Sequence, residues 1–262
     1  MLDGYMVTPD KFTNQMNILI YGDPGVGKTH LAGTAQDVPE MRNVHVFNID
    51  GGLMTLAPRG DISATNIRTV GELESELYRI INHDPKFDGI KTVVIDNITE
   101  LQTLSLEEIT TRESAVRKKK DKNYTIDDVY LEDYKIGGTQ LARVLRGFRD
   151  LPMNVIYIAH RKDKMRKGTQ TLEESKPSLT DKLCTAVMGY MDFVWYLYTA
   201  DEIEEYESNG QVLQMSVTHR YLLTQPMNLF KAKTRGEKFA QRIGTIIRDP
   251  NMVDIMSKYI EE

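Results

Sequence analysis

Eight consecutive residues have the types and the spacing of a phosphate-binding loop. The run Gly22-Asp23-Pro24-Gly25-Val26-Gly27-Lys28-Thr29 fills every fixed position of the pattern G-x-x-x-x-G-K-[ST]. Its glycines allow successive backbone N–H groups to point inward at a phosphate. Lys28 would neutralise β- and γ-phosphate oxygens, and the Thr29 hydroxyl would ligate the Mg²⁺ that accompanies them. We therefore expect this loop, with the adjoining His30, to bind ATP and Mg²⁺.

Two carboxylates that end predicted strands could complete such a site. Asp96 ends a continuous β-branched run and is the expected Mg²⁺ ligand, directly or through water. Hydrolysis also needs a carboxylate that orients and polarises water, and Asp50 is the candidate base. Two alternatives stay open: Glu100 or no dedicated base, and an Asp50 that only caps the turn at Gly51.

His160 ends a third apolar run and is a candidate sensor of the γ-phosphate. The strand before it is expected to lie between the strand of the phosphate loop and the strand of Asp96. A contact with the γ-phosphate would then order residues 161–178 in the ATP state and release them afterwards. The alternative is a neutral, hydrogen-bonded histidine of no special role.

Two basic runs are candidates for binding single-stranded DNA, although a net charge of -5 does not indicate a general nucleic-acid binder. They lie within residues 111–136 and 161–178, which we expect to be loops, the first mobile or ordered by a partner. Basic loops would track phosphates, and Tyr124 or Tyr130 would stack on bases. A solvated charged surface is the alternative. The candidate contacts are Arg117, Lys118, Lys119, Lys120, Lys122, Arg161, Lys162, Lys164, Arg166 and Lys167.

The rest of the chain alternates between strand and helix patterns. Alternation of this kind predicts an α/β fold with a mostly parallel, doubly wound sheet in one domain over residues 1–262. Residues 211–225 alternate around a turn expected at Thr218-His219 and predict an antiparallel hairpin near the carboxyl end. Residues 249–262 predict a final helix, with Asp249 as its N-cap. The remaining expected elements are an arm at 1–15, strands at 16–21, 44–50, 92–97, 154–160 and 192–198, and helices at 30–36, 71–81, 99–116, 139–150 and 180–191.

Composition excludes several classes of protein. A chain of 262 residues that is 40% apolar can bury a sizeable core. One cysteine, Cys184, makes no disulfide framework and no cysteine zinc site. No apolar run approaches the length of a membrane span and the start lacks a secretion signal, so we expect a cytoplasmic protein without a membrane partner.

The order of these features resembles the RecA family over about residues 14–248. In AAA-type machines a catalytic glutamate directly follows the Walker B aspartate, whereas here Asn97 follows Asp96. The resemblance implies that Asp50 takes the place of the catalytic glutamate, with slow hydrolysis because its side chain is one methylene shorter. It also implies that Lys231 and Lys233 reach the ATP of a neighbouring subunit in a ring or filament. Arg235 is a further candidate for this contact, and the alternative is that all three cations only pair with surface acids.

Within that superfamily, four short segments look like those of the phage ATP-binding proteins of the Sak type, single-strand annealing relatives of RecA. They are Ile49–Leu53, Ala159-His160, Tyr221–Gln225 and Lys233–Arg235. The resemblance implies a DNA-stimulated ATPase that acts on single-stranded DNA in phage recombination or replication, beside a single-strand-binding protein in the host cytoplasm. RecA's extra terminal domains are absent from the pattern. The alternatives are an AAA-type helicase loader or remodeller and a nucleotide-dependent scaffold with negligible hydrolysis.

Overall fold

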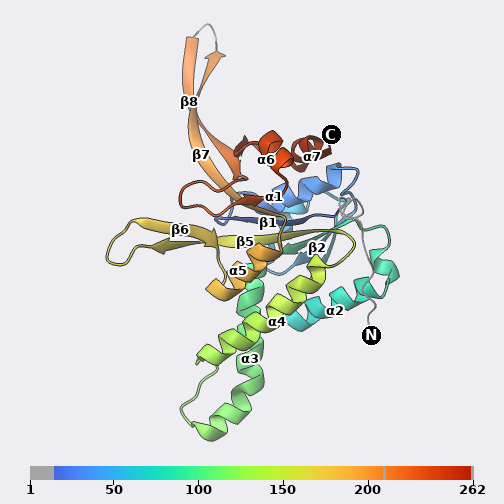
Figure 1. Ribbon diagram of the computed structural model, residues 1–262, viewed down its shortest axis with the longest axis vertical. Coiled ribbons are helices and arrows are strands. Elements are labelled where there is room, and N and C mark those ends of the chain that lie inside the picture. Colours follow the sequence, from blue (N-terminus) through green and yellow to red (C-terminus); the bar gives the residue numbers. More distant parts are fainter. Residues whose placement is uncertain (1–14, 209–210, 261–262) are drawn as a thin grey trace.

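A central sheet with helices on both faces organises the chain (Figure 1). The computed structural model describes residues 15–208 and 211–260, so the arm expected at 1–15 lies almost entirely outside the described residues. The order of strands along the sheet is β10-β8-β7-β1-β5-β4-β2-β3, with β6 paired to β5 and β9 paired to β7. The strands are β1 (Asn17–Gly22), β2 (Val44–Asn48), β3 (Ser63–Asn66), β4 (Thr92–Asp96), β5 (Asn154–Met165), β6 (Leu172–Pro177), β7 (Phe193–Ser208), β8 (Gln211–Leu223), β9 (Lys233–Thr234) and β10 (Ile246–Arg248).

The middle of the sheet is parallel and brings the loops of four strands to one edge. Strand β5 pairs in parallel with β1 on one side and with β4 on the other, as expected for the strand that precedes His160. Strand β2 pairs in parallel with β4 and β3, and β7 pairs in parallel with β1. Because parallel strands reach the same edge, the residues that follow β1, β2 and β4 converge there with His160 of β5.

Strand β1 shows how the two faces of the sheet are buried. Ile18 and Ile20 point into one apolar cluster, whereas Leu19 and Tyr21 point into the other. The first cluster contains residues of α1 (Lys28–Gly33), α6 (Glu237–Ile243) and α7 (Met252–Ile260). The second contains residues of α2 (Val70–Ile81), α3 (Ile98–Lys120), α4 (Leu131–Arg149) and α5 (Asp181–Tyr190). A strand that is apolar on both faces therefore lies inside a three-layer α/β domain. Within the described residues, no helix combines the length and the apolar character needed to cross a membrane.

The segment 111–136, expected to be a loop, is helical at both ends. Helix α3 runs on to Lys120 and α4 begins at Leu131, which leaves only ten connecting residues. An ion pair between Arg117 and the buried Asp133 holds the two helix ends together, and the Tyr130 ring lies 4.6 Å from the Arg117 guanidinium. The prediction was wrong because this pairing joins residues that are sixteen positions apart, which local periodicity does not reveal.

The segment 161–178 is also regular rather than a loop. Strand β5 continues past His160 to Met165, and β6 pairs with it in antiparallel register from Arg161↔Pro177 to Met165↔Leu172. The basic run is therefore one arm of a hairpin that extends the central strand beyond the sheet.

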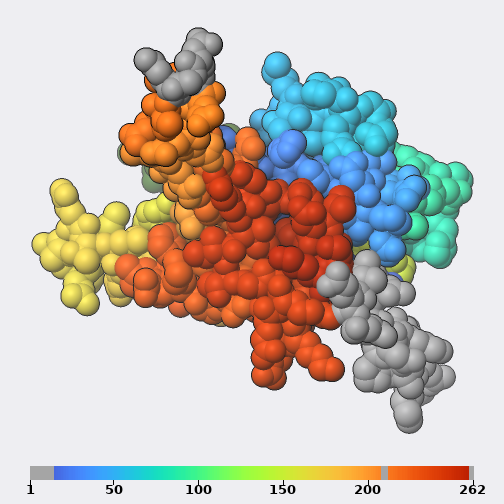
Figure 2. All heavy atoms as spheres, turned by 90° about the horizontal axis from the view of Figure 1, so that it is seen from above, coloured from blue at the N-terminus to red at the C-terminus, as the bar shows by residue number. Residues whose placement is uncertain are grey.

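The antiparallel hairpin near the carboxyl end is not where we expected it. β8 is continuous from Gln211 to Leu223, so no turn lies at Thr218-His219, and its partner is β7 in an unbroken register from Tyr196↔Leu223 to Ser208↔Gln211. Asp249 is also not the cap of the last helix: Asn251 accepts a hydrogen bond from the backbone N–H of Asp254. In Figure 2 the β5–β6 hairpin (yellow) and the β7–β8 hairpin (orange) stand apart as separate projections.

Candidate nucleotide site

The phosphate loop connects β1 to α1 at the edge of the sheet where the parallel strands end. Gly25 and Gly27 have φ angles of 79° and 98°, in the left-handed region that only glycine adopts readily. Gly22 is in close contact with β7, because a Cβ added there would lie 2.2 Å from the carbonyl oxygen of Leu197. Three of the loop's positions therefore require glycine for reasons visible in the backbone.

Lys28 is buried beneath its own loop. Its Nζ donates hydrogen bonds to the carbonyl oxygens of Gly22 at 3.1 Å and Asp23 at 2.8 Å. Burial lowers the pKa of the Lys28 ammonium, and the nearby carboxylates, with Asp96 the strongest, oppose that shift. Neutral carbonyl oxygens thus hold the Lys28 ammonium at the loop. The ammonium has lost its water on burial, and a bound phosphate would replace that solvation.

Thr29 and Asp96 place two oxygens side by side. The Thr29 hydroxyl donates to Asp96 Oδ2 at 2.5 Å, although the two residues are 67 positions apart. Burial raises the pKa of Asp96 to about 6, and the hydrogen bond from Thr29 opposes the shift. A hydroxyl and a carboxylate are the hard oxygen ligands that Mg²⁺ takes in phosphate sites. These two residues therefore fit the expected ion, which would neutralise charge on the bound phosphates.

A row of three polar side chains continues from this pair. Asn97 Nδ2 donates to Asp50 Oδ2 at 2.6 Å and lies 3.3 Å from His160 Nε2. The other Asp50 oxygen accepts the backbone N–H of Gly52 at 3.0 Å, so Asp50 caps its turn and also faces the site. Asn97 itself is buried and caps α3 through Oδ1, which accepts the N–H of Glu100 at 2.8 Å. Strand β2 therefore positions Asp50, β4 and the start of α3 position Asn97, and β5 positions His160.

His160 is half-buried and favours the neutral form. Burial lowers the pKa of its imidazole, and the charge of Lys28 lowers it further against the opposing Asp50. Its Nε2 faces the Asn97 amide, so the ring proton belongs on Nδ1. That buried Nδ1 has no hydrogen-bond partner among the described residues. The ring is therefore a hydrogen-bond donor that no described residue satisfies.

These groups line one cavity of about 410 Å³. Its walls include most of the residues that we expected to bind ATP and Mg²⁺, together with Asp50 and His160; Glu100, the alternative base, is not among them. The lining residues are Pro24, Gly25, Gly27, Lys28, Thr29, His30, Asp50, Gly52, Thr55, Asp96, Asn97, His160 and Arg220.

Arg220, on β8, is a cavity residue that the sequence did not point to. Its Nε donates to the carbonyl oxygen of Val26 at 3.2 Å, and a Cβ added to Gly27 would lie 2.7 Å from that nitrogen. Arg220 was missed because the hairpin turn was predicted at residues 218–219. In the structure Arg220 instead lies within the continuous strand β8, which brings it to the cavity. The dipeptide Asn209-Gly210, which is typical of two-residue hairpin loops, was the available signal.

The basic cluster at 231–235 lies away from this cavity and is engaged within its own chain. Lys231 pairs with Glu174 at 3.1 Å, and Arg235 pairs with Asp192 at 2.9 Å. Lys233 donates to two carbonyl oxygens at the end of α5. A contact with a neighbouring subunit's ATP stays a prediction for these three cations.

The DNA-contact candidates divide into engaged and free side chains. Arg117 is held by Asp133, and Arg161 donates to Asp23, Asp163 and Tyr196, so neither is a free surface cation. Lys164 pairs with Glu173. Of the two tyrosines expected to stack on bases, Tyr124 is buried, whereas Tyr130 is 45% exposed and stays a candidate. The other seven candidates are exposed and form no ion pair with a described residue: Lys118, Lys119, Lys120, Lys122, Lys162, Arg166 and Lys167.

Comparison with known families finds one family whose match includes the whole cavity. A sequence model of the AAA domain family matches residues 14–236, a span that covers most of the chain and every residue that lines the cavity. No curated protein matches the chain. The matched family is one of nucleotide-binding P-loop ATPases, in agreement with the arrangement of Lys28, Thr29 and Asp96. The chain therefore belongs to the AAA domain family of P-loop ATPases.

Proposed function

We propose that this protein hydrolyses ATP and uses its nucleotide state to control its hold on single-stranded DNA, in phage recombination or replication. The observation that carries the proposal is the continuity of β5, which contributes His160 to the nucleotide cavity and then forms one arm of a basic hairpin. The resemblance to RecA relatives of the Sak type supports the same conclusion. It also supports self-association and action beside a single-strand-binding protein.

A direct contact joins the phosphate loop to that hairpin. Arg161, the residue after His160, donates from its guanidinium to Asp23 Oδ2 at 3.0 Å and to the Tyr196 hydroxyl at 2.7 Å. Asp23 belongs to the phosphate loop, so a movement of the loop on binding ATP changes the support at the base of the hairpin. The exposed cations Lys162, Arg166 and Lys167 lie beyond this support.

Residues of the cavity can be assigned to each step of ATP hydrolysis. Lys28 and the loop N–H groups would bind the phosphates, and Thr29 with Asp96 would hold Mg²⁺, which lowers the charge on the phosphates when bound. Asp50, held by the amide of Asn97, would accept the proton of the attacking water. The products are ADP and phosphate.

The test is turnover of ATP with and without single-stranded DNA. We expect slow basal turnover that rises severalfold with the DNA, because DNA bound to the β5–β6 hairpin would reposition His160 and Arg161 at the cavity. Tight ATP binding with no turnover in either condition would favour the nucleotide-dependent scaffold instead. Turnover that responds to a protein substrate and not to DNA would favour the AAA-type remodeller.

A further inference from the structure

The outer half of the β7–β8 hairpin is a long acidic projection that contacts β10 only at its base, where Arg248 pairs with Glu202 and Glu204. Beyond Thr199↔Arg220, β7 and β8 pair only with each other. Residues 201–219 contain five acidic residues and no lysine or arginine. An isolated two-stranded ribbon is marginally stable in water. A projection of this length is therefore expected to gain stability by packing against a further surface.

One face of this ribbon combines exposed apolar side chains with unpaired carboxylates. Val212 lies opposite Glu207, and Ile203, Glu205 and Glu207 alternate along β7, so all four side chains share a face. Ile203 and Val212 are 73% and 61% exposed. Glu205 and Glu207 form no ion pair with any described residue. The ribbon thus offers apolar side chains bordered by free negative charge.

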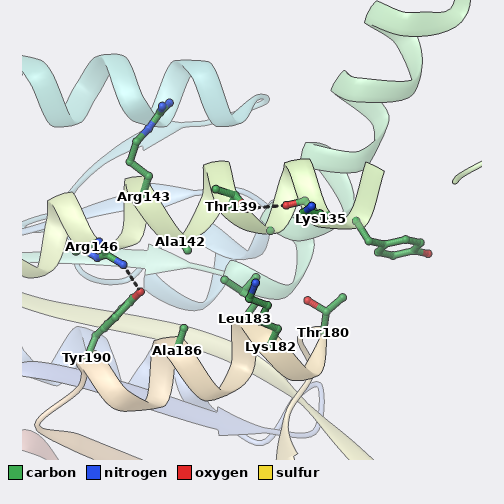
Figure 3. A pocket seen from close by; sticks show the side chains of 12 residues that line it. Lys135, Thr139, Ala142, Arg143, Arg146, Thr180, Lys182, Leu183, Ala186 and Tyr190 are labelled. Atoms are coloured by element: carbon green, nitrogen blue, oxygen red, sulfur yellow. Dashed lines mark hydrogen bonds between the residues drawn. The ribbon is translucent and has the colours of Figure 1, made fainter. Parts of the chain in front are cut away.

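A groove of complementary character lies between α4 and α5 (Figure 3). It has a volume of about 700 Å³, and its apolar floor includes Ala142, Leu183 and Ala186. Lys135 and Lys182 stand at its rim without ion pairs to described residues, whereas none of the lining residues is acidic. The groove therefore suits a segment that is apolar and negatively charged.

Further positive charge lies along the same groove. Arg146 donates to the Tyr190 hydroxyl at 2.8 Å across the space between the two helices, and its guanidinium lies 5.2 Å from that ring. Arg143 instead turns toward α2, where it pairs with Glu74. The floor is open above α4, since a Cβ built on Gly138 meets no atom within 4 Å.

The hairpin and the groove of one chain are too far apart to meet. Helix α5 ends at Tyr190, and Tyr206 lies thirteen residues after the start of β7, which is about 40 Å along a strand. Figure 1 shows the outer hairpin at the top of the view and the α4–α5 pair well below it. A contact between them must therefore join two copies of the chain.

We propose that the acidic β7–β8 hairpin of one copy docks in the basic groove between α4 and α5 of the next. Because the two surfaces differ, the contact is heterologous and repeats from copy to copy, closing a ring or extending a filament. This inference deepens the self-association within the proposed function, but it rests on charge complementarity and not on nucleotide or DNA binding.

The experiment is sedimentation velocity of the full chain over a range of concentrations, with and without a slowly hydrolysed ATP analogue. We expect concentration-dependent assembly of the native chain. The groove variant K135E/K182E and the hairpin variant E205K/E207K should each assemble at least about tenfold more weakly, because like charges then face each other. An equimolar mixture of the two variants should assemble as the native chain does, since each reversed surface meets its reversed partner.

Gly138→Leu supplies an uncharged test of the same groove. Leucine is a good helix former, so the variant should fold while its side chain fills the groove and blocks assembly. Thermal unfolding and binding of a fluorescent ATP analogue serve as folding controls for every variant.

A native chain that stays monomeric throughout would overturn the proposal, as would charge-reversed variants that still assemble or a mixture that stays apart. An acidic peptide or DNA that occupies the groove of such a monomer would identify another occupant. The ATPase test of the proposed function is unaffected by any of these outcomes.

Discussion

At the scale of single residues, Asp50 lines the cavity and is the proposed general base, and one substitution tests it. Asp50→Asn keeps the shape of the side chain and one oxygen, which accepts from either the Asn97 amide or the Gly52 N–H, but it cannot take a proton from water. We expect turnover to fall by about 10²-fold or more, with ATP affinity almost unchanged. Steady-state turnover and titration with a fluorescent ATP analogue measure the two quantities. Glu100→Gln is the control and should leave turnover near its native value; if it abolishes turnover while Asp50→Asn does not, the roles are reversed.

Arg220 is expected to contribute to nucleotide affinity. Its guanidinium lies against Val26 and Gly27 in the lining of the cavity, where a charge-assisted hydrogen bond to a phosphate would form. Arg220→Ala should weaken ATP binding about tenfold in the same titration. Arg248→Ala is the matched control, because that cation pairs with Glu202 and Glu204 outside the cavity. Equal affinities for Arg220→Ala and the native protein would remove Arg220 from the site.

The sequence predicted some of the residues that line the cavity and missed others. The phosphate loop, Asp96 and His160 follow short apolar runs, and a buried parallel strand determines locally where such a run ends. Asn97 and Arg220 were not predicted as parts of the site. The first acts through side-chain contacts with Asp50 and His160, and the second through a strand whose partner was misplaced. Both contacts join residues distant in sequence, which single-sequence patterns do not encode.

At the scale of elements, the proposed function requires that the nucleotide act on the β5–β6 hairpin. Arg161→Ala removes the contact with Asp23, so we expect DNA affinity to lose its dependence on nucleotide. Lys162→Ala is the matched control: an exposed, unpaired cation next in sequence, whose loss should weaken DNA binding similarly in every nucleotide state. Fluorescence anisotropy of a labelled oligonucleotide, measured with ADP and with a slowly hydrolysed ATP analogue, checks both. A nucleotide response that survives in Arg161→Ala would show that coupling takes another route.

The strands at the centre of the sheet were predicted within one or two residues at their starts, whereas the projecting segments were not. β1, β2 and β4 are short because they are buried on both faces and end at the site. β5 and β7 continue beyond the sheet as exposed ribbons that have no buried face, so their sequences lack a clear alternation of polar and apolar residues. Helix α3 likewise extends into a charged segment that is stabilised at its end by Arg117 and Asp133. Long-range pairing, not local pattern, sets the length of all three projections.

The first basic run is remote from the nucleotide. Lys118 lies twenty residues after the start of α3, about 30 Å along the helix. A direct influence of the bound phosphates on Lys118, Lys119 and Lys120 is therefore not expected. If these side chains contact DNA, their contribution should be the same in all nucleotide states.

At the scale of the whole molecule, stability should fall in mild acid because of a buried histidine. His45 contacts Ser63 and Thr65, and burial lowers the pKa of its imidazole from 6.5 to about 4. The unfolded chain therefore binds more protons than the folded one between these pH values. The contribution of His45 is fully present above pH 6.5 and is lost as the pH falls toward 4, by roughly 2 kcal/mol between pH 7 and pH 5.

Denaturant unfolding at several pH values measures this effect on the free energy of unfolding. The variant His45→Gln retains hydrogen-bonding capacity without a titrating group, so its free energy of unfolding should depend less on pH over the same interval. Parallel pH profiles for the variant and the native chain would assign the acid sensitivity to other groups.

The central claim concerns the whole molecule: the nucleotide in the cavity determines the hold of the β5–β6 hairpin on single-stranded DNA. The most direct measurement is the affinity of the native protein for one labelled oligonucleotide without nucleotide, with ADP, and with a slowly hydrolysed ATP analogue, at fixed salt. We predict binding at least about tenfold tighter with the analogue than with ADP, an advantage that declines as salt is raised. Equal affinity in all three states, with nucleotide binding verified independently, would contradict it.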